Sequence, residues 1–304
     1  MSNGVITTGN FSKALWPGIN AWYGEEYDEW TTEYTEIFDT YPAQYRTEQD
    51  VLFSGFGLLS EKDEGAPISF DSAQQGFTTS YDQITYSRGF IVTREMLEDD
   101  QYNLMEKRAR ALAFSIRQTK EVTGAFVLNQ AFNTAVTYGD GEELISTSHP
   151  NQAGGTWANR AAVDADLSET AIENGLILID DFRDDRGLRI AVHGKKLIVP
   201  IELRYEAERI LNSVLQNDSE LNAVNAVRNM GALPDGYCVN HYLTDPNAWF
   251  IKSNVSDGFK QFVKREDSFE EDNDFSTENL LYKVSGRWAF GVTDPRCVFG
   301  SAGA

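Results

Sequence analysis

The sequence contains few of the residues that most often carry out chemistry. Histidine occurs three times and cysteine twice among 304 residues. Two cysteines, Cys238 and Cys297, are too few for a disulfide framework, and such a pair is typical of reduced thiols in a cytosol-like compartment. His193 and His241 lie far apart and lack the spacing of metal ligands. We therefore expect no metal site and no cofactor.

Long hydrophobic runs and an excess of positive charge are also missing. No stretch approaches the roughly 18 apolar residues that a membrane-spanning helix needs. The opening MSNGVITTGNFSKALWPG has no basic segment followed by an apolar run, so we expect no secretory signal. The formal net charge of −21 would repel nucleic acid and anionic membranes at long range, although solubility alone is the plainer explanation of it.

Three short motifs approach known sites and fall short of them. GFGLLS, from Gly55, has serine where a dinucleotide-binding loop has its third glycine, and no helix pattern follows. DNDFSTE, from Asp272, lacks the glycine of a calcium loop. His149 lies near Ser146 and Ser148 in a chain rich in acids. A cytosolic Ser/His/Asp hydrolase therefore stays open as an alternative, although there is no G-x-S-x-G elbow.

The longest predicted element is a helix at about 103–133, entered almost directly from a strand that contains Ile84 and Tyr86. One face is apolar, and about 30 residues would give a rod of roughly 45 Å. The other face is basic, with Lys107, Arg108, Arg110, Arg117 and Lys120. Two interpretations of that face stay open: contact with an acidic helix predicted at 25–39, or simple exposure to solvent.

Residues 52–91 are rich in Gly, Ser, Thr and aromatics, and they predict two strands that fold back through an acidic middle at Glu61–Pro67. A two-stranded ribbon cannot bury a core of its own. It must pack on its own subunit or on a neighbouring molecule. As contacts to a neighbour we select five apolar residues of the ribbon and three basic residues of the long helix: Phe56, Leu58, Phe70, Phe77, Tyr81, Lys107, Arg108 and Arg110.

The second half of the chain predicts a smaller α/β unit at 165–270, because helix patterns alternate there with short apolar strands. Residues 266–279 are interpreted as an acidic loop. Residues 280–292 alternate apolar and polar side chains, which is typical of a long strand with one buried face. The fold class is therefore α+β.

The order of these parts resembles the major capsid proteins of tailed bacteriophages, of the Hong Kong 97 fold, and is most similar to the Mu-like major head subunit group. The resemblance rests on the following segments in this order: LWPGINAWYG, YTEIFDTYPAQYRTEQD, GFGLLSEKDEGAPISFDSAQQGFTTSY, YSRGFIVTREMLEDDQYN, GDGEELISTSHPNQAGGTWANR, KKLIVPIELRYEAERIL and YKVSGRWAFGVTDPRCVFGSAG. It implies an N-terminal arm (1–51), an extended β-hairpin loop (52–91), a peripheral domain with the spine helix (92–164 and 271–304) and an axial domain (165–270).

The same resemblance implies a function without enzymatic activity. The chain would assemble with itself, as hexamers and pentamers, into an icosahedral virion shell that is built in the host cytoplasm and encloses double-stranded DNA without sequence-specific binding. A portal, a separate scaffolding protein and a decoration protein would be its partners. An encapsulin, a compartment shell of the same fold that holds a cargo enzyme, is the alternative within the fold.

Overall fold

The computed structural model describes most of the chain outside its first twenty residues. The described residues are 21, 23–24, 31–53, 55–65, 67–72, 75–93, 95–96, 104–152, 154–215, 224–274 and 279–304. Most of the predicted arm, and Trp30 of the predicted acidic helix, lie outside this set.

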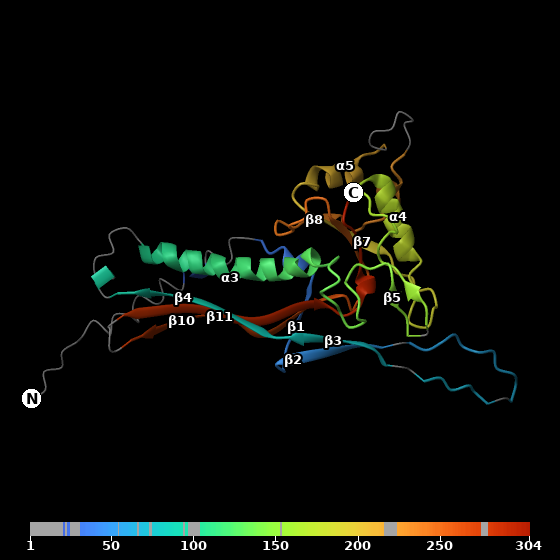
Figure 1. Cartoon of the computed structure of the whole chain (residues 1–304), viewed down its shortest axis with the longest axis horizontal. Helices are drawn as coiled ribbons and strands as arrows, with labels where there is room; N and C mark the ends of the chain where they lie inside the picture. The colour runs from blue at the N-terminus through green and yellow to red at the C-terminus, as the bar shows by residue number, and fades with distance from the viewer. Residues whose placement is uncertain are drawn as a thin grey trace, which may run out of the picture.

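An elongated body is formed by a four-stranded sheet with one long helix lying along it (Figure 1). The sheet order is β1-β10-β11-β4. Strand β10 (Phe259–Asn273) pairs antiparallel with β11 (Leu280–Val292), which pairs antiparallel with β4 (Ile84–Val92). The short strand β1 (Asp39–Pro42) runs parallel to β10. Helix α3 (Leu104–Asn129) is the predicted long helix, ending four residues earlier than expected.

The apolar side of α3 explains why the helix packs on this sheet. Its residues at spacings of three and four, Leu112, Ala113 and Ile116, are buried against Val284 and Trp288 of β11. The indole N–H of Trp288 donates to Thr123 Oγ1 at 3.1 Å, so the one polar group of that ring is satisfied.

A second sheet lies beyond one end of the first, with three helices around it (Figure 1). Its order is β12-β9-β7-β8, which are Val298–Ser301, Trp249–Ser253, Gly194–Val199 and Tyr237–Val239. The helices are α4 (Glu169–Asp180), α5 (Arg204–Asn212) and α6 (Ala226–Met230). Ser168 caps α4 by accepting from the Ala171 N–H, as a serine before a helix commonly does.

The two sheets share one apolar junction. It buries Phe259 and Val292 of the first sheet beside Ile198 and Phe250 of the second. Both cysteines lie here as free thiols, with Cys297 buried and Cys238 packed against the same cluster. Burial raises the pKa of the Cys238 thiol to about 12 and that of Cys297 well above its ordinary value.

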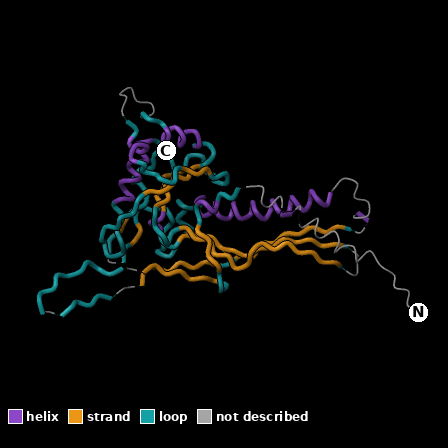
Figure 2. The backbone as a smooth tube through the Cα atoms, turned by 180° about the vertical axis from the view of Figure 1, so that it is seen from behind, coloured by secondary structure: helices purple, strands orange, loops and turns teal. Residues whose placement is uncertain are grey.

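Only part of the ribbon predicted at 52–91 is a hairpin that projects from the body, because its end, from Ile84 onward, is strand β4 of the first sheet. Strand β2 (Thr47–Phe53) pairs antiparallel with β3 (Gln75–Asp82), and the chain between them forms a long loop that extends beyond the rest of the subunit (Figure 2). A second, minimal hairpin joins β5 (His149–Pro150) to β6 (Thr156–Trp157).

Two sequence predictions are wrong. The helix expected to continue to residue 39 is only a 3-10 turn, η2 (Tyr34–Glu36), before strand β1 begins. The acidic loop expected at 266–279 is strand through Asn273, because partners on β11 supply its hydrogen bonds, and Lys283 balances one of its acids, Glu270, at 2.9 Å. The acidic composition of this segment predicted a loop, but its pairing with a distant strand makes it a strand.

We expect the substitution Trp288→Ala to lower the free energy of unfolding by about 3–5 kcal/mol, because it empties a fully buried site between α3 and the sheet. Val122→Ala, on the exposed side of the same helix, is the matched control and should change it by less than about 0.5 kcal/mol. Urea unfolding of the two variants measures both. Equal, small changes would show that α3 does not pack on β11 as described.

Candidate assembly surfaces

The loop between β2 and β3 exposes large apolar side chains. Leu59 is 98% exposed, Phe70 is 90% and Leu58 is 83%, and Phe56 and Ile68 are also exposed. Monomeric soluble proteins rarely leave such a concentration of apolar surface in water, so these residues are a candidate interaction site. Of the five loop contacts that the sequence selects, Phe56, Leu58 and Phe70 are on this free surface.

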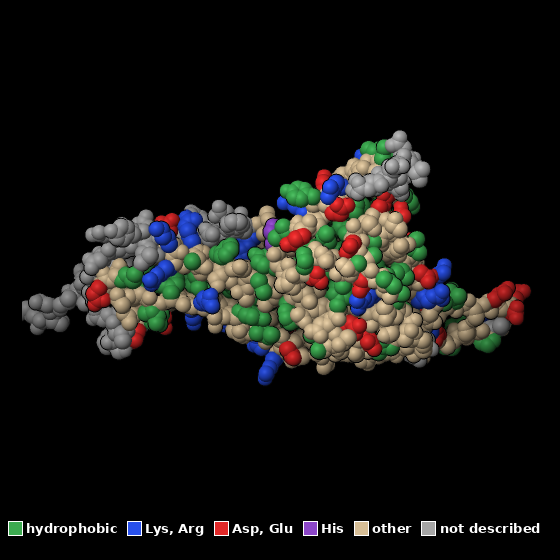
Figure 3. Space-filling model, turned by 45° about the horizontal axis from the view of Figure 1, so that its top comes forward, with side chains coloured by type: hydrophobic (Ala, Val, Ile, Leu, Met, Phe, Trp, Pro, Cys, Tyr) green, Lys and Arg blue, Asp and Glu red, His purple; other side chains and the backbone are tan. Residues whose placement is uncertain are grey.

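The tip of the same loop is acidic. Glu61, Asp63 and Glu64 are exposed, and Gly65, with φ +80°, provides the left-handed residue of the turn. The acidic side chains gather at the far end of the projection in Figure 3. The loop therefore has an acidic tip, and exposed apolar residues lie along the two limbs that lead to it.

The other two selected loop residues are within their own subunit. Phe77 is half-buried and lines a small pocket with Leu52 and Trp157. Tyr81 is 3% exposed, packs edge-on against Phe262 and shares a hydrogen bond of 2.7 Å with Thr293. Because the Tyr81 ring is buried within its own subunit, it has no exposed surface with which to contact a neighbour. Tyr81 is therefore no longer a candidate for such a contact.

A partly buried polar network anchors the root of the hairpin. The Thr293 hydroxyl donates to Asp50 Oδ2 at 2.6 Å, and the Lys260 ammonium donates to Asp50 and, at 2.8 Å, to Asp257. Burial alone would lower the pKa of Lys260, but the hydrogen bonds to the two carboxylates outweigh it and raise that pKa. The hairpin therefore leaves the body from a fixed point.

The basic residues of α3 divide into two groups. Lys107 is exposed, Arg108 is half-buried, and Arg110 lies 3.2 Å from Glu106 one turn away, so the three selected residues lie toward solvent. Arg117 and Lys120 are buried instead. Lys120 lies 2.7 Å from Asp267 of β10, so this part of the expected basic face is a buried ion pair inside the subunit.

Residues 25–30 of the segment expected to be an acidic helix lie outside the described residues, and its described part contacts α3 through an acid of α3. The acid is on α3: Glu121 accepts hydrogen bonds from the backbone N–H groups of Glu33 (2.9 Å) and Tyr34 (3.0 Å). Desolvation raises the pKa of Glu121, and these two donors partly oppose that rise. Within the described residues of that segment, this contact orients the start of η2 against α3.

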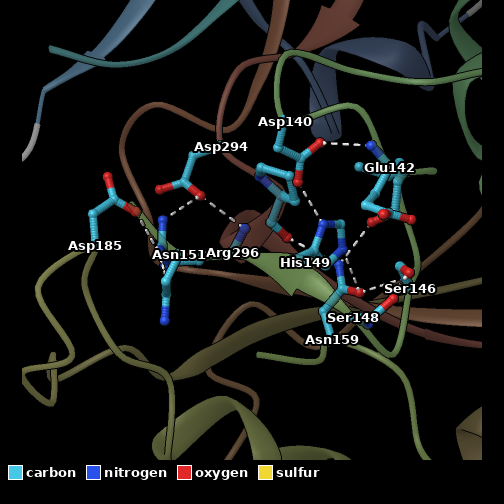
Figure 4. A network of polar contacts seen from close by, with 12 residues as sticks. Asp140, Glu142, Ser146, Ser148, His149, Asn151, Asn159, Asp185, Asp294 and Arg296 are labelled. Atoms are coloured by element: carbon cyan, nitrogen blue, oxygen red, sulfur yellow. Dashed lines mark hydrogen bonds and ion pairs between the residues drawn. The ribbon is translucent and has the colours of Figure 1, made fainter. Parts of the chain in front are cut away.

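His149 is part of a closed network of polar contacts (Figure 4). Its Nδ1 lies 2.6 Å from Asp140 Oδ2 and its Nε2 lies 3.1 Å from Asn159 Oδ1. The Asn159 amide nitrogen donates to the carbonyls of Leu144 and Pro295, which fixes its orientation. Both nitrogens of a fully buried ring are thus occupied, and neither is available to activate a serine hydroxyl.

The His149 ring also begins a stack of three side chains. It lies on Trp157 with ring centres 4.6 Å apart, and the Arg296 guanidinium lies over the same indole at 4.8 Å. Arg296 donates to Asp185 at 2.8 Å and to Asp294 at 3.3 Å, with all three residues buried (Figure 4). Burial raises the pKa of Asp294, and Arg296 opposes that rise.

Other kinds of site find no support in the part of the chain that the structure describes. Within it, no three His, Cys, Asp or Glu side chains gather as metal ligands would. No helix there is both long and apolar enough to cross a bilayer.

Several of the solved structures that the chain resembles are capsids or virus-like particles. The chain aligns with a virus-like particle protein from Pyrococcus furiosus at a TM-score of 0.58 and 11% identity, over 94% of this chain and 98% of that one. It aligns with the procapsid of bacteriophage JBD30 (TM-score 0.52, 15% identity, 97% and 76% covered) and with Mycobacterium phage Che8 (0.53, 13%, 90% and 92%). The fold is the Hong Kong 97 capsid fold.

The amino-acid sequence also identifies the family to which the chain belongs. The family model described as phage capsid protein matches residues 76–300, which is most of the chain. The chain belongs to this phage capsid protein family. No curated protein matches it.

Sequence reasoning missed the residues that hold these surfaces in place. Lys260 and Asp50 are 210 positions apart, and Arg296 and Asp185 are 111 apart. No periodicity connects such residues. No local pattern marks Lys260 or Arg296 either, because each lies close to another polar residue, Gln261 in one case and Asp294 in the other.

We expect His149→Ala to lower the free energy of unfolding by about 3–5 kcal/mol, because it leaves the buried Asp140 carboxylate without its partner. The matched control is His193→Ala, whose imidazole lies 3.0 Å from Asp180 but is largely exposed, and its loss should cost less than about 1 kcal/mol. Chemical denaturation of both variants is the measurement. A stable His149→Ala protein would contradict the structural role and favour the hydrolase alternative.

Proposed function

We propose that this phage capsid protein is the major head subunit, which assembles with copies of itself into the icosahedral shell that encloses double-stranded DNA. The observation that carries the proposal is the projecting loop, whose apolar residues lie beyond the reach of their own subunit's core. A second copy is the partner that every assembling subunit meets, and repeated head-to-tail contacts close into rings.

Each domain expected from the sequence would have its own role in the shell. Residues 1–51 would act as the arm and 52–91 as the loop that reaches a neighbour. Residues 92–164 with 271–304 would form the peripheral domain around α3, and 165–270 would form the axial domain near the centre of hexamers and pentamers. We further propose membership of the Mu-like head subunit group, and a portal, a scaffolding protein and a decoration protein as partners.

The proposed subunit has no enzymatic role. The engaged nitrogens of His149 argue against the hydrolase alternative, and the phage capsid family match disfavours the encapsulin alternative. Assembly in the host cytoplasm and residence in the virion shell complete the proposal. An acidic subunit, at −21, would repel packaged DNA and so suits a container that must release its contents.

The first test replaces Phe56, Leu58 and Phe70 by serine together. We expect a folded subunit whose threshold concentration for particle formation rises at least tenfold, because about 1.4 kcal/mol of lost contact energy already gives that factor. Val163→Ser, also strongly exposed but outside the loop, is the control and should assemble normally. Sedimentation velocity and negative-stain microscopy measure the threshold, and normal shells from the triple variant would refute the loop's role.

The second test reverses charge on α3 with Lys107→Glu and Arg108→Glu. If these residues contact a neighbour, the double variant should fold normally and assemble only at a concentration several-fold higher, and added salt should narrow that difference. The control is Lys195→Glu, an exposed lysine of the second sheet that pairs with Asp235. An unchanged threshold would remove α3 from the interface.

A further inference from the structure

One arginine connects the projecting loop to the body of its own subunit. Arg186, in the turn after α4, lies with its Nη1 2.5 Å from Asp71 Oδ2 and its Nη2 2.6 Å from the Ser72 carbonyl oxygen. Asp71 and Ser72 are in the returning limb of the loop, 115 and 114 positions away in sequence. The guanidinium therefore holds that limb through two donors at once, a geometry that fixes direction as well as distance.

The Asp71 carboxylate extends the hold to the outgoing limb. The same Oδ2 atom accepts the backbone N–H of Gly57 at 2.9 Å, and Oδ1 accepts the N–H of Ser72 at 2.8 Å. Farther out, the hydroxyls of Ser60 and Ser69 share a hydrogen bond of 2.7 Å between the two limbs. The Gly57 N–H, and after it Arg186, lower the pKa of the Asp71 carboxyl, so the group is a charged acceptor at neutral pH.

Arg186 is itself held in a rigid turn. Asp184 Oδ1 accepts the N–H groups of Arg186 (2.9 Å) and Leu188 (2.8 Å), and Gly187, with φ +81°, allows the chain to reverse. The preceding residue, Asp185, points the other way and forms the buried pair with Arg296. Of these two adjacent residues, Asp185 therefore binds the body of the subunit and Arg186 binds the loop.

We propose that Arg186 is a positioning residue for shell assembly, which sets the direction in which the loop leaves the subunit. This inference rests on the function proposed above and deepens it. An exposed ion pair contributes little to the stability of the fold. Its value lies in assembly, because a loop already ordered before it meets a neighbour loses less conformational entropy on docking.

The neighbouring Arg189 offers a matched control. It lies three residues away in the same turn region. Its guanidinium is 2.7 Å from Asp181, and it forms no hydrogen bond or ion pair with the described residues of the loop. Arg186→Ala and Arg189→Ala therefore remove the same side chain and one exposed ion pair each, and only the first releases the loop. The exchanged pair, Arg186→Asp with Asp71→Arg, restores opposite charges in reversed order.

Hydrogen exchange of the full-length, unassembled subunit tests directly whether Arg186 fixes the loop. In Arg186→Ala, we expect peptides that contain Gly57 and Ser72 to exchange at least tenfold faster than in the wild type, with the urea midpoint unchanged. Arg189→Ala should leave both peptides as they are. Unchanged exchange in Arg186→Ala would overturn the proposal, because the loop would then be oriented by something else.

The assembly threshold of the same proteins tests the consequence. Arg186→Ala should require a several-fold higher concentration to form particles, Arg189→Ala should not, and the exchanged pair should recover part of the loss. Faster exchange with an unchanged threshold would refute the positioning role while leaving the shell function intact. A wild-type chain that never assembles, alone or with a scaffolding partner, would refute the shell function itself, and exchange would still decide whether Arg186 holds the loop.

Discussion

The pairing of β11 on both of its edges is the constraint on which the rest of the structure depends. Along its length it joins β10 on one side and β4 on the other, and its inward face receives α3. The chain then passes through the buried Arg296 into β12, which edges the second sheet. One continuous C-terminal stretch therefore fixes the relative placement of both sheets, and the hairpin root is tied to it through Thr293.

The distribution of charge explains how so acidic a chain can associate with itself. Copies that each carry −21 repel one another at long range, so association needs short-range attraction that screening by salt leaves intact. The apolar limbs of the loop meet this requirement, whereas the ion pairs of Lys120 and Arg296 are committed inside the subunit. Assembly of such a subunit should therefore respond to ionic strength mainly through the reduction of repulsion.

Elements with a strong local period could be predicted, and those created by distant contacts could not. The apolar spacing of α3 and the alternation of β11 are visible in sequence because each repeats within a few residues. The acidic end of β10 was misread as loop, since its partner strand is what makes it a strand. In the candidate surface, the exposed Phe56, Leu58 and Phe70 followed from composition, but the burial of Tyr81 and the hold of Arg186 depend on residues more than 100 positions away.

The two thiols at the junction of the sheets have a practical consequence for experiments that label the loop. A thiol reacts as its thiolate, and the raised pKa values of Cys238 and Cys297 leave almost none of that form at neutral pH. The native chain is therefore close to silent toward maleimide and iodoacetamide dyes. A single cysteine placed on the exposed loop would carry the only fluorescent or spin label, and the wild-type background would need no alteration before the spectroscopy began.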